Sequence, residues 1–128
     1  MADLADALPF AALLGVDISK AEQDEVIGAM QVRPDLCTAG DRLHGGALMA
    51  FADSLAGIGA FLNLPEGAEG TTTVESKTNF TGGAPVGAAL TGVATPLKVG
   101  KRVSVWQTRI TSDDSNLVGL VIQTQLVL

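Results

Sequence analysis

The chain has 128 residues, of which 47% are hydrophobic and 17% are charged, and its formal net charge is −6. This length predicts one domain, residues 1–128, that can bury a sizeable core. The high hydrophobic content disfavours intrinsic disorder. The excess of acidic residues disfavours nucleic acid as a main partner. The single cysteine, Cys37, excludes an internal disulfide.

The apolar parts of the sequence bear on location and assembly. The apolar N-terminal run lacks a basic segment before it, and no run approaches the roughly 20 apolar residues of a membrane span. We therefore expect a soluble, cytoplasmic protein without a membrane partner. So much apolar sequence in a small domain also predicts that part of the surface is covered in a homo-oligomer.

The first half of the chain predicts two helices and a hairpin. Residues 4–14 are typical of a short amphipathic helix that ends at Gly15. Residues 16–22 and 25–32 alternate weakly around a polar turn, which indicates a hairpin. We expect irregular structure over 33–43, then a long helix over about 45–63.

The second half predicts strands. These are the threonine-rich segment 71–80, segments 88–97 and 102–111 around the turn "KVGK", and segment 117–128. In the last segment, Gln123 and Gln125 fall on the face opposite most of the apolar residues. The predicted fold class is α+β: an antiparallel, curved sheet of five to six strands wrapped around one long central helix.

Small residues along the long helix would let the strands approach closely. Glycine inside a helix costs up to roughly 1 kcal/mol relative to alanine, so Gly57 and Gly59 require a packing reason.

The start of this helix reads His44-Gly45-Gly46. The first N–H groups of a helix lack intrahelical partners and carry partial positive charge. Without side chains in the way, a ligand oxygen could approach Gly45 or Gly46, which would make an oxyanion hole. The alternative is that the glycines only turn a loop into a helix, and the tripeptide alone favours that alternative.

Asp53 is the only charged residue within the long helix. A buried, unpaired carboxylate costs several kcal/mol, so Asp53 must have partners, be neutral or face a cavity. The residues one turn away are Met49, Ala50, Ala56 and Gly57, which provide no polar face. This pattern favours a functional carboxylate in a cavity that excludes most water.

His44 and Asp53 are nine residues apart. In a helix this spacing places them about half a turn out of phase and roughly 13 Å apart along the axis. One helix cannot bring both to the same scissile bond. The spacing therefore predicts a site shared between subunits, in a dimer or a dimer of dimers.

The segment "LHGGALMAFAD" resembles the HGG-x6-D/E helix of hotdog-fold acyl-CoA thioesterases, of the phenylacetate-degradation and 4-hydroxybenzoyl-CoA types. The segments "TTVESKTNFTGGAP" and "LKVGKRVSVWQTRI" are similar to the strands that follow in that family. The resemblance implies a hotdog fold. It also implies hydrolysis of an aryl- or medium-chain acyl-CoA to free acid and CoA, without a metal or redox cofactor.

The resemblance also implies roles. The Gly45 N–H would polarise the thioester carbonyl, and Asp53 of the neighbouring subunit would be nucleophile or general base. His44 would orient the loop or the thioester group. Thr73 would hydrogen-bond the water or the acid, although the alignment leaves Thr71 and Thr72 open for that role.

The same resemblance places Gly46 and Thr38 against the substrate. Many relatives carry Asn or Gln six residues before the histidine, where this chain has Thr38. A threonine hydroxyl donates a hydrogen bond but reaches less far than an amide. Water placement, substrate choice or rate could therefore differ.

Other residues leave alternatives open. Lys98, Lys101 and Arg102 would bind CoA phosphates or form a solvated turn. Cys37 is more typical of a small core residue than of a nucleophile paired with His44. For Trp106 the sequence leaves two places open, the core and the lining of a pocket. The rival functions are a hotdog enoyl-CoA hydratase or dehydratase and a CoA-ester binding protein with little turnover.

Overall fold

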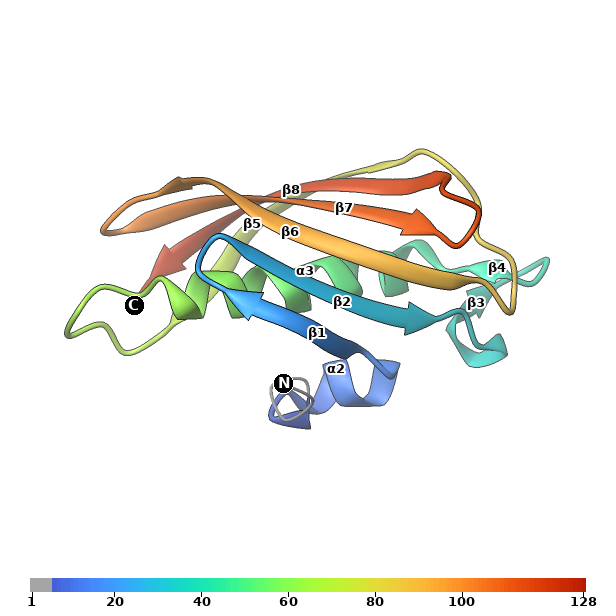
Figure 1. Cartoon of the computed structure of the whole chain (residues 1–128), viewed down its shortest axis with the longest axis horizontal. Helices are drawn as coiled ribbons and strands as arrows, with labels where there is room; N and C mark the ends of the chain where they lie inside the picture. The colour runs from blue at the N-terminus through green and yellow to red at the C-terminus, as the bar shows by residue number, and fades with distance from the viewer. Residues whose placement is uncertain (1–5) are drawn as a thin grey trace.

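The computed structural model, which describes residues 6–128, has one helix lying along a six-stranded antiparallel sheet (Figure 1). The strand order is β1-β2-β6-β7-β8-β5, so β1 and β5 are the edges. The elements in chain order are α2 (Pro9–Leu14), β1 (Asp17–Glu22), β2 (Glu25–Gln31), a 3-10 turn (Pro34–Leu36), β3 (Cys37–Thr38), β4 (Arg42–Leu43), α3 (Gly45–Leu62), β5 (Thr71–Phe80), β6 (Ala89–Val99), β7 (Val103–Ser112) and β8 (Leu117–Val127).

This arrangement confirms the hotdog fold that the resemblance implies. The predicted long helix and all the predicted strands form, with ends shifted by at most two residues. The predicted helix over 4–14 is observed as Pro9–Leu14, and its residues 4 and 5 lie outside the described part of the chain. The prediction of irregular structure over 33–43 was wrong in part, because Cys37–Thr38 pairs with Arg42–Leu43.

A pair of facing glycines lets α3 sit close to the sheet. Gly28 on β2 is paired with Gly92 on β6, and the Leu55 side chain lies against both. A Cβ at Gly28 or Gly92 would lie 2.7 Å or 2.6 Å from a Leu55 methyl carbon. Leu55 is fully buried there, and burial of a leucine side chain contributes roughly 1.5–3 kcal/mol.

Trp106 provides the packing reason for Gly59. The indole is fully buried in the core, where its N–H donates to Ser104 Oγ at 3.0 Å. A Cβ at Gly59 would lie 2.5 Å from the Trp106 ring, whereas a Cβ at Gly57 would meet nothing within 4 Å. The close packing expected of both helix glycines is thus confirmed for Gly59 and absent for Gly57 within the described chain.

We expect Gly59→Ala to destabilise the protein by about 1–3 kcal/mol, because the added methyl overpacks the core against the indole. Gly57→Ala is the matched control, since it makes the same change two residues earlier in open space. Gly57→Ala should leave stability unchanged or raise it by up to about 1 kcal/mol through helix propensity. Urea denaturation measures both, and equal effects of the two changes would contradict the packing account.

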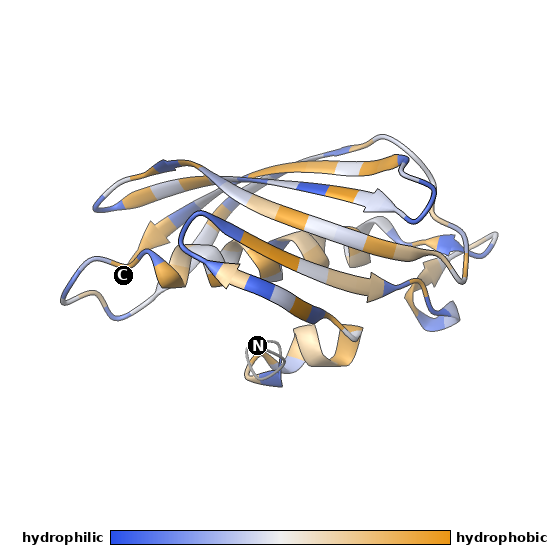
Figure 2. Ribbon diagram, in the orientation of Figure 1, coloured by the Kyte–Doolittle hydropathy of each residue, from blue (hydrophilic) through white to orange (hydrophobic). Residues whose placement is uncertain are grey.

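One face of α3 is left uncovered by the sheet. The residues of α3 that are buried lie on the other faces of the helix; they are Leu48, Phe51, Ala52, Leu55, Ala56, Ile58, Gly59 and Ala60. By length and composition α3 is the one helix among residues 6–128 that could cross a membrane, and 44% of it is buried inside the fold. Figure 2 shows the helix apolar along most of its length, with hydrophilic turns at β1–β2 and β6–β7. Packing against the sheet accounts for much of this apolar sequence.

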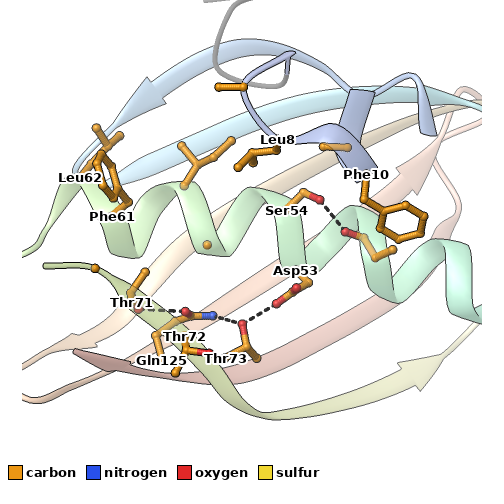
Figure 3. A pocket seen from close by; sticks show the side chains of 16 residues that line it. Leu8, Phe10, Asp53, Ser54, Phe61, Leu62, Thr71, Thr72, Thr73 and Gln125 are labelled. Atoms are coloured by element: carbon orange, nitrogen blue, oxygen red, sulfur yellow. Dashed lines mark hydrogen bonds between the residues drawn. The ribbon is translucent and has the colours of Figure 1, made fainter. Parts of the chain in front are cut away.

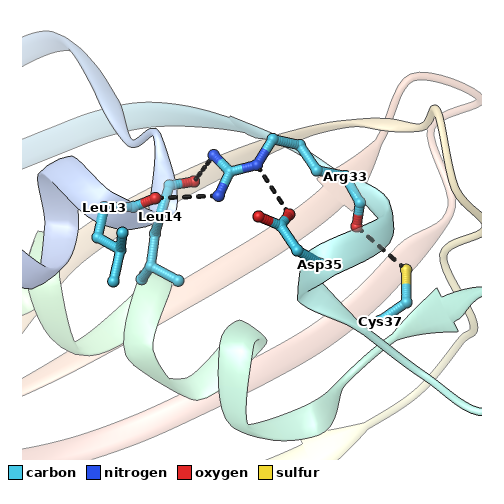
Figure 4. Close-up of polar contacts among 5 residues, drawn as sticks. All are labelled: Leu13, Leu14, Arg33, Asp35 and Cys37. Carbon is cyan, nitrogen blue, oxygen red and sulfur yellow. Dashed lines mark hydrogen bonds and ion pairs between the residues drawn. The ribbon is translucent and has the colours of Figure 1, made fainter.

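Arg33, which lies two residues after β2, binds the C-terminal end of α2 (Figure 4). Its guanidinium donates to the Leu13 carbonyl at 3.0 Å and to the Leu14 carbonyl at 3.1 Å, and it also donates to the Asp35 carboxylate at 3.0 Å. The last carbonyls of a helix have no partner within the helix, so Arg33 supplies one for these two. The hydrogen bond from Arg33 holds the pKa of the Asp35 carboxyl below its usual value. Because α2 forms one wall of the pocket described next, this contact helps to shape that pocket.

Candidate active site

Asp53 lies at the end of a chain of hydrogen bonds (Figure 3). Its Oδ1 accepts from the Thr73 hydroxyl at 2.6 Å and from the Gln123 side-chain amide at 2.9 Å. Thr73 Oγ1 in turn accepts from Gln125 Nε2 at 2.6 Å, and Gln125 Oε1 accepts from the Thr71 hydroxyl at 3.0 Å. The carboxylate on the apolar helix therefore has partners from β5 and β8.

A β-bulge decides which threonine reaches Asp53. The register of β5 against β8 shifts between Thr73 and Glu75, so Val74 is an extra, exposed residue. An extra residue reverses the alternation of side chains along the strand. Thr71 and Thr73 consequently face the helix ahead of the bulge, while Thr72 is exposed and hydrogen-bonds to none of these groups.

Asp53 opens into a pocket of about 670 Å³ beside α3. The polar part of its lining includes Asp53, Thr71, Thr73 and Gln125, and the apolar part comes from α3, from α2 and from the two residues before α2 (Figure 3). The apolar lining residues are Ala7, Leu8, Phe10, Ala11, Ala50, Gly57, Ile58, Phe61 and Leu62. Such a lining suits an apolar group placed next to a carboxylate.

The expectation that Asp53 is shielded from water is not met in the single chain, where this residue is exposed. The reason is that Gly46, Met49, Ala50, Asp53, Gly57 and Phe61 follow one another at helical spacing on the face of α3 away from the sheet. None of these six is buried. In the single chain, Asp53 therefore lies on an uncovered face of α3 and not in a closed cavity.

The start of α3 explains the His-Gly-Gly sequence. His44 is the N-cap, and its Nδ1 accepts from the Gly46 N–H at 2.8 Å. A Cβ at Gly46 would lie 2.9 Å from that nitrogen, so a side chain there would displace the imidazole. An accepting Nδ1 places the proton of the neutral ring on Nε2. His44 and Gly46 thus cap the helix, and the Gly46 N–H is already used.

The Gly45 N–H is the donor that stays free. It has no acceptor among residues 6–128, and Gly45 is the first residue of α3, where the N–H groups carry partial positive charge. A Cβ at Gly45 would lie 3.0 Å from the Phe80 ring, at the end of β5. Of the two glycines, only Gly45 can offer its N–H to a carbonyl oxygen.

A second pocket, of about 410 Å³, lies at this end of the helix. His44, Gly46, Cys37 and Phe10 are among its lining residues, and Phe10 also lines the Asp53 pocket. The Cys37 thiol is half-buried and donates to the Arg33 carbonyl at 3.3 Å. No hydrogen bond joins it to His44 within residues 6–128, so the chain provides no Cys–His nucleophile pair there.

The remaining candidates lie outside both pockets. Thr38 is exposed on β3, where it pairs with Arg42. Lys98, Lys101 and Arg102 are exposed around the β6–β7 turn, at the end of the molecule that holds the C-terminal end of α3 (Figure 1). Within one chain, these three bases therefore lie far from the helix start.

The free donor and the carboxylate belong to different places on one helix. Gly45 and Asp53 are eight residues apart, which is about 12 Å along a helix axis. A donor and a carboxylate that act on one carbonyl group must both lie within about 3 Å of the reacting atoms. One chain alone does not bring its own pair together.

Comparison with known proteins places the chain in a family. The model of the thioesterase superfamily matches residues 40–118. A Mycobacterium tuberculosis protein named "Putative esterase Rv1847" is 31% identical over 113 residues, which are 87% of this chain and 80% of that protein. Its solved structure has a TM-score of 0.90 at 27% identity, covering 94% and 97% of the two chains.

Two more distant structures share the fold. The PaaI protein of the Escherichia coli phenylacetic acid degradation operon is 18% identical with a TM-score of 0.88, and 99% of this chain and 95% of that one are covered. A hypothetical thioesterase protein with coenzyme A from Streptococcus pneumoniae is 21% identical with a TM-score of 0.81, and the coverage is 88% of this chain and 85% of that one.

The fold and these matches define a hotdog protein of the thioesterase class. The chain belongs to the thioesterase superfamily, and it is a thioester hydrolase.

Proposed function

We propose that the protein hydrolyses an acyl-CoA thioester, with the carbonyl bound at Gly45 of one protomer and attacked with the help of Asp53 of its partner. The observation that carries the proposal is the Asp53 carboxylate, which is held by Thr73 and Gln123 beside an apolar pocket. A CoA-bound hotdog structure from Streptococcus pneumoniae supports CoA esters as the substrate class.

In this reaction Asp53 accepts a proton from a water molecule whose oxygen attacks the thioester carbonyl carbon. The Gly45 N–H stabilises the negative charge that develops on the carbonyl oxygen. The C–S bond then breaks, and the departing thiolate takes the proton, which leaves a free acid and CoA. Direct attack by Asp53 on the carbonyl would instead give a mixed anhydride that water hydrolyses to the same products.

The apolar wall of the Asp53 pocket favours an aryl or medium-chain acyl group over a charged one. His44 would hold the helix start in place and present its Nε2–H beside the thioester. Gly46 lines the second pocket in the single chain, and Thr38, which lies outside it, would meet the substrate only in the assembled protein. No cofactor is needed beyond the CoA of the substrate, and the cytoplasm stays the expected compartment.

Three features favour a dimer that completes the site. The α3 face with Asp53 is uncovered, and the outer edge of β5 pairs with no strand among residues 6–128. A ten-residue free edge is a ready template for pairing with another chain. The apolar side chains of Val74 and Phe80 on β5 and Phe61 on α3 are exposed. A dimer or a dimer of dimers would cover these surfaces.

We expect the basic β6–β7 turn to bind CoA phosphates of the partner's substrate. Alanine at Lys98, Lys101 and Arg102 should then raise KM far more than it lowers kcat, because these contacts bind ground state and transition state equally. The increase should be largest at low salt, since the residues are exposed. An unchanged KM for a full CoA ester would favour a merely solvated turn.

The test of the function is a panel of acyl-CoAs incubated with the purified protein and a thiol reagent. Release of free thiol supports hydrolysis. Binding without release would point to a CoA-ester binding protein, and addition of water to an enoyl-CoA without thiol release would point to a hydratase. Either of the last two results would overturn the proposal.

A further inference from the structure

Gln125 takes no part in the proposed function as stated so far, and Gln123 takes part only as a hydrogen-bond partner of Asp53, yet both are fully buried on β8. A buried amide is costly unless its hydrogen bonds are made. Both amides face α3, and both donate into the Asp53 group. An apolar residue at either position would pack against the helix without this cost. The placement therefore requires a reason other than packing.

We propose that Gln123 and Gln125 are positioning residues that aim the Thr73 proton at Asp53 Oδ1 and leave Oδ2 as the reacting oxygen. The proposal rests on the proposed function, because it assigns the geometry by which Asp53 acts. It adds which oxygen reacts and which residues outside contact with the substrate determine that choice.

The direction of the hydrogen-bond chain follows from its two ends. An ionised carboxylate can only accept, so the single Thr73 proton points to Asp53. Thr73 Oγ1 must then accept from its other neighbour, which requires Gln125 to present its Nε2. The Thr71 hydroxyl donates to Gln125 Oε1 and thereby fixes the amide in that orientation. Each hydrogen bond from Thr71 through Gln125 and Thr73 to Asp53 therefore has only one possible direction.

Gln123 acts on the carboxylate itself. Its Nε2 is the second donor to Oδ1, and its Oε1 is buried without a partner. Within residues 6–128, Asp53 Oδ2 receives no hydrogen bond. The two donors hold the plane of the carboxylate and occupy one oxygen. The other oxygen stays available to a water or a carbonyl carbon in the pocket.

The test measures kcat and KM of the full-length oligomer for the best acyl-CoA of the panel. Gln125→Met keeps the length of the side chain but removes the donor to Thr73. Thr71→Val removes only the hydroxyl that orients Gln125, at a residue that has no hydrogen bond to Asp53. Thr124→Val is the matched control, because Thr124 lies between the two glutamines and its hydroxyl bonds Glu75 instead.

Gln125→Met and Gln123→Met should each lower kcat by about 10- to 100-fold, the scale of a lost hydrogen bond that serves a charged group. Thr71→Val should lower kcat by several-fold, and Thr71→Ser should restore it because the hydroxyl returns. KM should change much less than kcat. Thr124→Val should keep the wild-type kcat.

A role limited to packing the pocket wall would raise KM or lower the melting temperature without this kcat pattern, and would overturn the proposal. The Asp53→Asn enzyme, measured beside these variants, distinguishes failure of the positioning proposal from failure of the proposed function. If Asp53→Asn loses turnover while the glutamine and Thr71 variants keep wild-type kcat, the positioning proposal fails and the proposed function stands. If folded Asp53→Asn keeps wild-type turnover, both fail.

Discussion

Replacing Asp53 by asparagine should lower kcat by roughly 100-fold or more while the protein stays folded. Asparagine keeps the size of the side chain, and its Oδ1 can still accept from Thr73 and Gln123. It removes the negative charge that accepts a proton or attacks the carbonyl, and the loss of an acid–base group has this magnitude. The measurement is steady-state thiol release beside a melting curve.

Asp24→Asn is the control for this change, because it removes one negative charge in the exposed β1–β2 turn. It should leave kcat and KM as they are. The exposure of Asp53 in the single chain also means that Asp53→Asn need not raise stability, as the loss of a buried charge would. A folded Asp53→Asn enzyme with near-normal turnover would remove this residue from the mechanism.

Replacing Gly45 by proline should lower kcat by about 100- to 1,000-fold, the range for loss of one oxyanion donor. Proline removes the N–H and is favoured at the first position of a helix, where that group has no partner. His44 precedes it with φ −66° and ψ 135°, a conformation that residues before proline prefer. The helix should therefore form normally.

Gly45→Ala separates the N–H from the space around it. Alanine keeps the N–H but adds a Cβ close to the exposed Phe80 ring, which can rotate away. The alanine variant should keep most of the activity that the proline variant loses. Equal losses in the two variants would show that room at this position matters, and not the donor.

The sequence predicted the long helix and the strands of the main sheet correctly, and it pointed to the residues at the two ends of the candidate site, for a physical reason. Glycines and a histidine at a helix start, and one acid in an apolar helix, are local patterns that tertiary structure hardly changes. The sequence left both glycine N–H groups open to a ligand, but the structure uses the Gly46 N–H for the helix cap, because the His44 imidazole accepts from it. That detail depends on a side-chain rotamer, which a sequence pattern does not contain.

The partners of Asp53 could not be derived in the same way. The bulge at Val74 decides that Thr73 faces the acid, and neither strand alternation nor composition indicates a bulge there. Alternation along β8 separates the glutamines from most of the apolar residues, but it does not say which face meets the helix. The structure buries Gln123 and Gln125, and two glutamines spaced by two in an apolar strand were the available signal.

The most direct test of the shared site is thiol release by a mixed oligomer of two inactive chains. Co-expression of Gly45→Pro and Asp53→Asn chains with different tags, followed by two-step purification, yields oligomers that contain both. In a mixed dimer one site has lost both groups, and the other has an intact Gly45 and an intact Asp53. If the site is shared between protomers, the mixed dimer should recover about half of the wild-type rate per dimer while each parent stays inactive. A mixed dimer as inactive as its parents, beside an active wild type, would contradict a shared site.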